Sequence, residues 1–182
     1  ALIAMGREEL GRMIQDELRE ISCFPLNEEI PKKKEIISSR TFGKPVYELS
    51  LLRESIACYA SLACEKLRKQ ESVCQEVEIF IRTNPFKESV EQYVRVNSVR
   101  LDSATCDTRK IIKVAWKLLD EIFINGYEYK KACVKLGRIQ DADEHQVSLF
   151  GGYDSPEDLA IMRAMDRINS RDGHETLRGN RR

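Results

Sequence analysis

Residues 77–85 read Val-Glu-Ile-Phe-Ile-Arg-Thr-Asn-Pro, and this stretch decides the fold. Apolar and polar side chains alternate from Val77 to Thr83, which predicts a β-strand with one buried face. Asn84-Pro85 then ends the strand, because proline lacks the backbone donor that a central strand needs. The side chains expected on the buried face are Val77, Ile79 and Ile81. Those expected on the opposite face are Glu78, Phe80 and Arg82.

Five further elements surround this strand. Residues 36–42, 93–101 and 129–139 are also predicted to be strands. Residues 49–70 and 106–124 carry apolar side chains at helical spacing and are predicted to be helices. The order is therefore β-α-β-β-α-β. Two helices cannot bury their apolar stripes on each other and also cover both sides of four strands, so we predict an α+β fold with both helices on one face of the sheet.

The opposite face of the sheet is then open to solvent or to a partner. In the third strand Val94 and Val96 are expected to share the core side. Its expected open-face residues are Tyr93, Arg95 and Asn97. In the fourth strand the expected open-face residues are Lys131, Cys133 and Lys135. The alternation of the first strand leaves open whether Ser38 and Arg40 or Ser39 and Thr41 face outward.

The formal net charge is zero, yet the charges are unevenly distributed. Residues 1–30 carry net −4, residues 31–139 net +7 and residues 140–182 net −3. A local basic field attracts phosphate whatever the total charge, although chance clustering on a solvated surface is the alternative. No pair of the six cysteines has CxxC spacing, so we expect no metal site and reduced thiols in a cytoplasmic protein.

Both ends of the chain extend beyond the predicted sheet domain. A helix is expected over 7–21, followed by a linker that ends in Lys32-Lys33-Lys34. Ser155-Pro156-Glu157-Asp158 predicts the start of a second outer helix, since it combines a capping serine, a first-turn proline and two acids. The apolar stripe of this tail helix includes Leu159, Met162 and Met165. The stripe either docks on the body or waits for a partner.

Four strings, in this order, resemble the C-terminal region of UmuC-type translesion DNA polymerases of the Y family. They are Leu18-Arg19-Glu20-Ile21-Ser22-Cys23-Phe24, Ser38-Ser39-Arg40-Thr41-Phe42-Gly43, Gly126-Tyr127-Glu128-Tyr129-Lys130-Lys131-Ala132 and Arg163-Ala164-Met165-Asp166-Arg167-Ile168-Asn169-Ser170-Arg171. The parts that the resemblance implies are the end of a thumb (1–24), a basic linker (25–35), a little-finger DNA-binding domain (36–139), a flexible linker (140–154) and a tail with one helix (155–182).

The resemblance also implies that DNA binding and catalysis belong to different domains. The little finger holds the primer-template duplex by phosphate contacts, in error-prone synthesis during the SOS response to DNA damage. The catalytic palm and its Mg²⁺ belong to a part of such polymerases that does not match this sequence, so we expect this chain alone to be inactive and to bind no cofactor. The family further implies UmuD′ and RecA as partners.

The pentapeptide Gln146-Val147-Ser148-Leu149-Phe150 resembles the bacterial motif that binds the sliding clamp. Two adjacent apolar side chains in a polar, acidic linker have no local core to join, which suits a docking peptide. The alternative is that Leu149 and Phe150 pin the tail to the body. In this chain Val147 replaces the commoner leucine.

The predicted DNA contacts are basic or polar residues of the open face and of the first linker. They are Lys32, Lys33, Lys34, Arg40, Thr41, Arg82, Arg95, Lys131 and Lys135. Phosphate contacts hold a duplex without reading its sequence. The alternative function is a protein-interaction module, in which the open face and the tail helix bind accessory proteins. No apolar run approaches the roughly 20 residues that span a bilayer, so we expect no membrane partner.

Overall fold

The computed structural model describes residues 32–89, 91–143 and 154–172, together with four isolated residues nearer the N-terminus, Arg12, Gln15, Leu18 and Arg19. The chain divides into two compact units, residues 1–32 and 33–182, and the fold below is that of the second unit. Most of the predicted helix over 7–21 and all of the pentapeptide 146–150 lie outside the described residues.

The order of elements in the second unit confirms the predicted β-α-β-β-α-β arrangement. The elements are β1 (Ile36–Val46), α2 (Leu49–Lys69), β2 (Ser72–Arg82), β3 (Val94–Thr105), α3 (Thr108–Ile122), β4 (Tyr129–Asp141) and α4 (Pro156–Asp172). The strands extend beyond their predicted ends, because ladder pairing continues into residues whose side chains no longer alternate.

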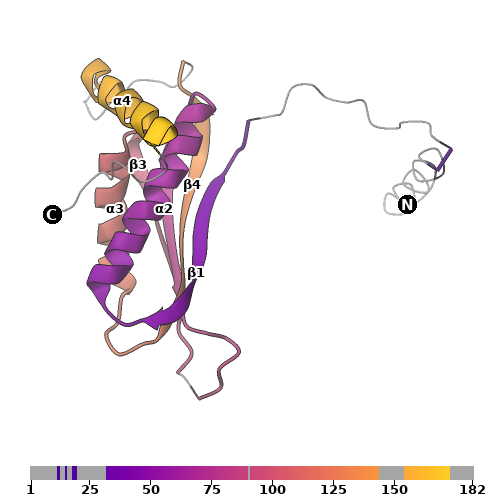
Figure 1. Ribbon diagram of the computed structural model, residues 1–182, viewed down its shortest axis with the longest axis vertical. Helices are drawn as coiled ribbons and strands as arrows, with labels where there is room; N and C mark the ends of the chain where they lie inside the picture. Colours follow the sequence, from indigo (N-terminus) through magenta and orange to yellow (C-terminus); the bar gives the residue numbers. More distant parts are fainter. Residues whose placement is uncertain are drawn as a thin grey trace. The chain divides into compact units, whose positions relative to one another are not determined.

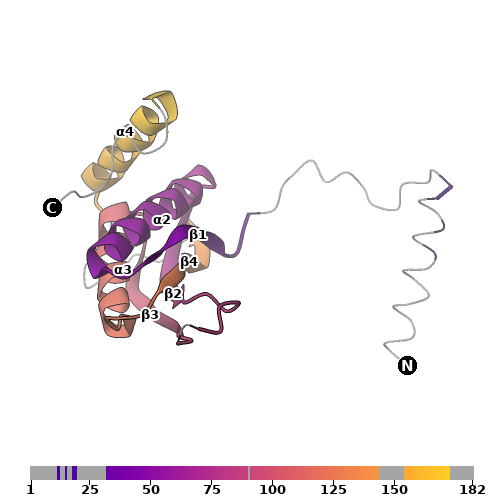
Figure 2. The same ribbon diagram turned by 60° about the horizontal axis from the view of Figure 1, so that its bottom comes forward.

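The four strands form one antiparallel sheet in the order β1-β4-β2-β3. The last strand of the sequence therefore lies between the first two, and β1 and β3 are the edges. Figures 1 and 2 show α2 and α3 side by side on one face of this sheet, as predicted. The other face carries no helix among the residues that the structure describes. The fold is thus α+β with one covered and one open face.

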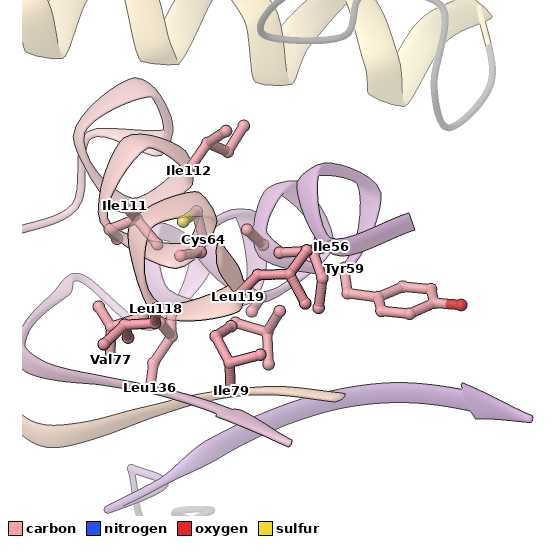
Figure 3. Close-up of a cluster of buried hydrophobic side chains, with 14 of the residues drawn as sticks. Ile56, Tyr59, Cys64, Val77, Ile79, Ile111, Ile112, Leu118, Leu119 and Leu136 are labelled. Carbon is pink, nitrogen blue, oxygen red and sulfur yellow. The ribbon is translucent and has the colours of Figure 1, made fainter. Parts of the chain in front are cut away.

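The core fills the space between the helices and the covered face. Side chains of Ile56 and Leu119 lie above Ile79 of β2, and all three are fully buried (Figure 3). The central strands contribute alternate residues to this layer. Those of β2 and β4 with no exposed surface include Val77, Ile79, Ile81, Ala132, Val134 and Leu136. Only one face of the sheet is buried, so apolar and polar side chains alternate along β2 and β4. This alternation is why the sequence predicts both strands and their buried faces.

Local sequence sets the boundaries of these elements. Asp107 caps α3 by accepting a hydrogen bond from the Arg109 backbone N–H at 2.8 Å. Gly126 has φ of +97° in the turn before β4, a conformation that favours glycine. A Cβ at Gly137 would lie 2.9 Å from the end of the Glu76 side chain, which would have to move aside.

The predicted start of the tail helix is confirmed. The Ser155 hydroxyl accepts the Asp158 backbone N–H at 3.1 Å, and the Asp158 carboxylate accepts the Ser155 backbone N–H at 3.2 Å. This reciprocal pair satisfies two donors at the helix start. The Arg109 guanidinium also donates to Asp158 and, with Ser155, holds the pKa of that carboxyl below its ordinary value.

Contacts with the body hold α4 against the ends of α2 and α3. Met162 has 0% exposed surface, and Leu159 packs against the core. The Arg68 guanidinium donates to both Asp166 oxygens, at 2.6 and 2.7 Å, and to the Cys106 carbonyl at 2.7 Å. Of the two alternatives that the sequence leaves open for Leu159, Met162 and Met165, partner binding or docking on the body, these contacts favour docking. Met162 is committed to intramolecular packing, and Met165 is half-buried.

Three thiols gather in the interior near this junction. Cys64, Cys74 and Cys106 are buried and free. Burial raises the pKa of Cys64 to about 12 and that of Cys106 to about 11, so both are protonated near neutral pH. They act as small core residues. None of the helices in the described part of the chain is long and apolar enough to cross a membrane.

Candidate nucleic-acid interface

The open face is the sheet surface that α2 and α3 leave uncovered. Because paired residues of an antiparallel sheet point to the same side, the register defines rows across this face. The first row contains Thr41, Lys131, Arg82 and Val94. The second contains Ser39, Cys133, Phe80 and Val96. The third contains Ile37, Lys135, Glu78 and Ser98. The open-face positions predicted for β2 and β4 agree with these rows.

The first row carries positive charge that no carboxylate of the described residues neutralises. We call Thr41, Lys131 and Arg82 the cation row. Lys131 and Arg82 are direct neighbours in the ladder, so two like charges lie side by side. Within residues 32–89, 91–143 and 154–172, neither forms an ion pair. Adjacent cations repel each other, and an anionic partner is what would relieve that repulsion.

The third row differs because its lysine is paired. Lys135 Nζ lies 3.2 Å from Glu78 Oε2 and 3.8 Å from Glu35 Oε1. Burial by itself lowers the pKa of Lys135, but the hydrogen bond and charge of Glu78 raise it above the ordinary lysine value. We call Lys135, Glu78 and Glu35 the paired end. Its positive charge is already balanced within the protein, which opposes the predicted contact of Lys135 with phosphate.

The predicted position of Arg95 is wrong. Arg95 pairs with Ile81, which lies in the core, so it belongs to the helix-covered face. Its guanidinium lies 5.1 Å from the ring centroid of Tyr93, whose hydroxyl donates to the Ile122 carbonyl of α3 at 2.7 Å. The alternation misled because β3 is an edge strand, and its exposed valines were taken for core residues.

Arg40 is on the covered side as well. It pairs with Ala132, which in turn pairs with Ile81, so Arg40 and Arg95 end the same row at opposite edges of the sheet. Both side chains are exposed. Of the two residues predicted in β1, only Thr41 reaches the open face.

The basic linker residues lie near the start of β1. Lys32, Lys33 and Lys34 are exposed. The Lys33 backbone is fixed by a reciprocal pair of hydrogen bonds with the Gln70 side chain, at 3.2 and 3.1 Å. The linker therefore joins the body at the C-terminal end of α2.

Sequence reasoning missed three features of this interface. Val94 and Val96 lie on the open face and are 50% and 52% exposed. Lys44 is exposed within a bulge of β1, where the pairing shifts between Thr41 and Val46. No local pattern identifies the valines, because β3 is oriented by a tertiary contact of Tyr93 with Tyr127, whose ring centroids lie 4.6 Å apart. A buried Tyr93 fixes the phase of β3.

The described residues contain no cluster of His, Cys, Asp and Glu that could hold a metal ion. The open face carries the side chains of the three rows. It offers two unpaired cations and a hydroxyl in one row, bordered by apolar side chains.

Comparisons with known proteins show the family of this chain. A family model described as the impB/mucB/samB family C-terminal domain matches residues 33–149. Protein UmuC of Salmonella typhimurium is 36% identical over 162 residues, which cover 88% of this chain and 38% of that protein. Protein SamB of Salmonella typhimurium is 32% identical over 167 residues, which cover 90% of this chain and 39% of that protein.

The fold resembles that in a solved structure described as a post-insertion binary complex of Dbh DNA polymerase. The TM-score is 0.50 at 12% identity, covering 74% of this chain and 36% of that one. The chain thus shares its sheet-and-helix fold with part of that structure. The chain belongs to the impB/mucB/samB family and contains its C-terminal domain. It spans less than half the length of these relatives.

Proposed function

We propose that this chain is the DNA-gripping and clamp-tethering part of an error-prone translesion DNA polymerase of the SOS response. The observation that carries the proposal is the cation row on an uncovered sheet face. Lys131 and Arg82 lie on adjacent central strands, where packing from behind holds their backbone rigid. A rigid pair of unneutralised cations suits two phosphates of one DNA strand.

Phosphate contacts also match the task. They fix the register and orientation of a duplex without depending on base identity. A polymerase that copies damaged templates needs a hold that tolerates altered bases. The proposed phosphate contacts are Thr41, Arg82 and Lys131. The linker residues Lys32, Lys33 and Lys34 attract the DNA.

The remaining parts of the chain keep their proposed roles. Residues 1–24 form the end of a thumb, and residues 140–154 tether the protein to the sliding clamp through the pentapeptide. The family relationship supports these roles. Most of the length of the relatives lies outside the matched part, and we place the polymerase active site and its Mg²⁺ there.

The DNA-binding proposal is tested by fluorescence anisotropy of a labelled primer-template duplex across a salt series. If at least two phosphates are contacted, log affinity falls linearly with log salt with a slope of about −1.8 or steeper. A slope near zero contradicts the proposal and favours the protein-interaction module.

The clamp tether has its own test. Replacing Leu149 and Phe150 with alanine is expected to weaken binding to the sliding clamp by about 30-fold, since anchors of this kind contribute about 2 kcal/mol. Surface plasmon resonance with immobilised clamp measures the change. The matched control replaces Leu51 and Ile161, two exposed apolar residues on α2 and α4. Equal affinity of the tether variant and the wild type contradicts the tether.

A protein-interaction module remains the second candidate because the family resemblance implies UmuD′ and RecA as partners. Burial of Met162 weakens this alternative, since the tail stripe is already occupied. The open face is the surface left for such a partner, and the salt series distinguishes it from DNA.

A further inference from the structure

The tail helix α4 buries little apolar surface against the body. Among the residues of α4 whose side chains are described, Met162 alone is fully buried, and Ile161 beside it is 46% exposed. By contrast, α3 buries an apolar stripe along its whole length. A helix that hydrophobic burial holds in place presents three or four apolar residues per two turns to the core. Apolar packing therefore holds α4 less firmly than it holds α3.

The carboxylate of Asp154, two residues before α4, is bound by three donors of the body. The Thr105 hydroxyl donates to it at 2.6 Å and the Cys106 backbone N–H at 2.8 Å. Lys110 Nζ lies 3.0 Å from Oδ1, and the Asp154 side chain is only 7% exposed. We call Thr105, Cys106 and Lys110 the carboxylate site. A hydroxyl, a backbone amide and an ammonium that converge on one point bind an anion and not an apolar group.

Two arginines of the body bind carboxylates of α4 itself. Arg68, at the C-terminal end of α2, donates to both oxygens of Asp166. Arg109, in the first turn of α3, donates to Asp158. Figure 1 shows α4 at this end of the helix layer. The side chains of Asp166 and Asp158 are 24% and 28% exposed, so both ion pairs are open to screening by salt.

The core of the sheet domain does not depend on α4. Its buried cluster is formed by side chains of the sheet, α2 and α3, and Met162 is not part of it. Leu159 packs only against the edge of this cluster, where it is partly buried. A helix of 17 residues is marginally stable in water by itself. Release of α4 would therefore leave the sheet domain folded while α4 loses its protection from solvent.

Three acids of the tail thus meet three cations of the body, and apolar packing between them is sparse. The pairs are Asp154 with Lys110, Asp158 with Arg109, and Asp166 with Arg68. We infer that α4 is a reversible latch, which these ion pairs hold closed on the carboxylate site and which rising ionic strength opens. Opening exposes Met162 and returns the three cations to solvent. Docking and exposure of the tail stripe are then two states of one equilibrium. The inference does not depend on the proposed DNA binding.

Amide hydrogen exchange of the full chain measures the opening. Raising NaCl from about 0.05 M to about 0.5 M is expected to speed exchange of the α4 amides roughly tenfold, because salt screens the ion pairs. The amides of α2 and β2 should keep their rates, because the core stays closed. The Cys106 amide should lose protection together with α4, since the Asp154 carboxylate leaves it when the latch opens.

The double variant Asp154→Asn with Asp166→Asn keeps the size of both side chains and removes two of the three tail charges. At about 0.05 M salt its α4 amides should exchange roughly 25-fold faster than those of the wild type, with most of the salt dependence lost. Glu88→Gln with Glu157→Gln is the matched control, since it removes the same charge from two exposed positions. This control should exchange like the wild type.

Two results would overturn the latch. The first is an α4 exchange rate that is the same at both salt concentrations and in both double variants, which would make α4 a permanent part of the body. The second is faster exchange in α4 with no change at Cys106. That result would show fraying of the helix and not its release from the carboxylate site.

Discussion

The two ends of the open face carry similar lysines in opposite electrostatic states. Lys131 and Lys135 both point outward from β4, four residues apart. Lys131 faces Arg82 across the ladder, whereas Lys135 faces Glu78 at 3.2 Å. The strand that carries both lysines is the same, so the neighbour on β2 makes the difference.

The comparison shows that a count of basic residues does not measure the field of a surface. A lysine beside a carboxylate is largely neutralised at short range, and moving a phosphate onto it means competing with that carboxylate. A lysine beside an arginine is stabilised by a bound anion, because the anion reduces the repulsion between the two positive charges. We therefore expect DNA affinity to depend on the cation row far more than on the paired end.

The largest expected effect comes from removing both unpaired cations. Lys131→Gln with Arg82→Gln should lower duplex affinity about 60-fold at 0.1 M salt and reduce the salt slope by about 1.8, because each phosphate contact contributes about 0.9. Anisotropy titrations measure both quantities. Lys113→Gln with Lys117→Gln, exposed on the helix-covered side in α3, removes the same charge as a control. Equal losses for the two double variants contradict the comparison.

A smaller, opposite effect should follow from releasing Lys135. Glu78→Gln removes its nearer partner, while Glu35 remains at 3.8 Å. Duplex affinity should rise about threefold at 0.1 M salt, roughly half of one phosphate contact on a logarithmic scale. Glu157→Gln on α4 is the control for the change in net charge. If Glu78→Gln binds duplex DNA no more tightly than that control, the ion pair between Lys135 and Glu78 does not lower DNA affinity.

The smallest expected effect is the shift in the pKa of Lys135 that its pairing with Glu78 causes. Its pKa is raised, so the charged pair stabilises the fold fully below the ordinary lysine pKa and the contribution is lost as pH rises through the raised value. NMR titration of the lysine side-chain signals should place the pKa of Lys135 above that of a model lysine. Glu78→Gln should return it toward the ordinary value. A pKa that Glu78→Gln leaves unchanged shows that the two groups are not coupled in solution.

The accuracy of the sequence predictions varied with position in the sheet. For the central strands, alternation placed Glu78, Arg82, Lys131 and Lys135 on the correct face, because helices bury the other face and force the pattern. For the edge strands it placed Arg95 on the wrong face and left β1 unresolved. On the edge strand β3 the exposed open-face residues include Val94 and Val96, while Tyr93 is buried on the other side, so apolar side chains no longer identify the core.

The sequence by itself determined the order of the elements, the α+β class and the start of the tail helix, because periodicity and capping depend on residues close together in the chain. Only the tertiary structure decided which strands are edges, which lysine faces a carboxylate and where the α4 stripe is buried. Lys135 and Glu78 meet only because β4 pairs with β2, and Met162 is buried only because α4 returns to α2 and α3. Contacts of that kind depend on the register between distant segments, which no local pattern specifies.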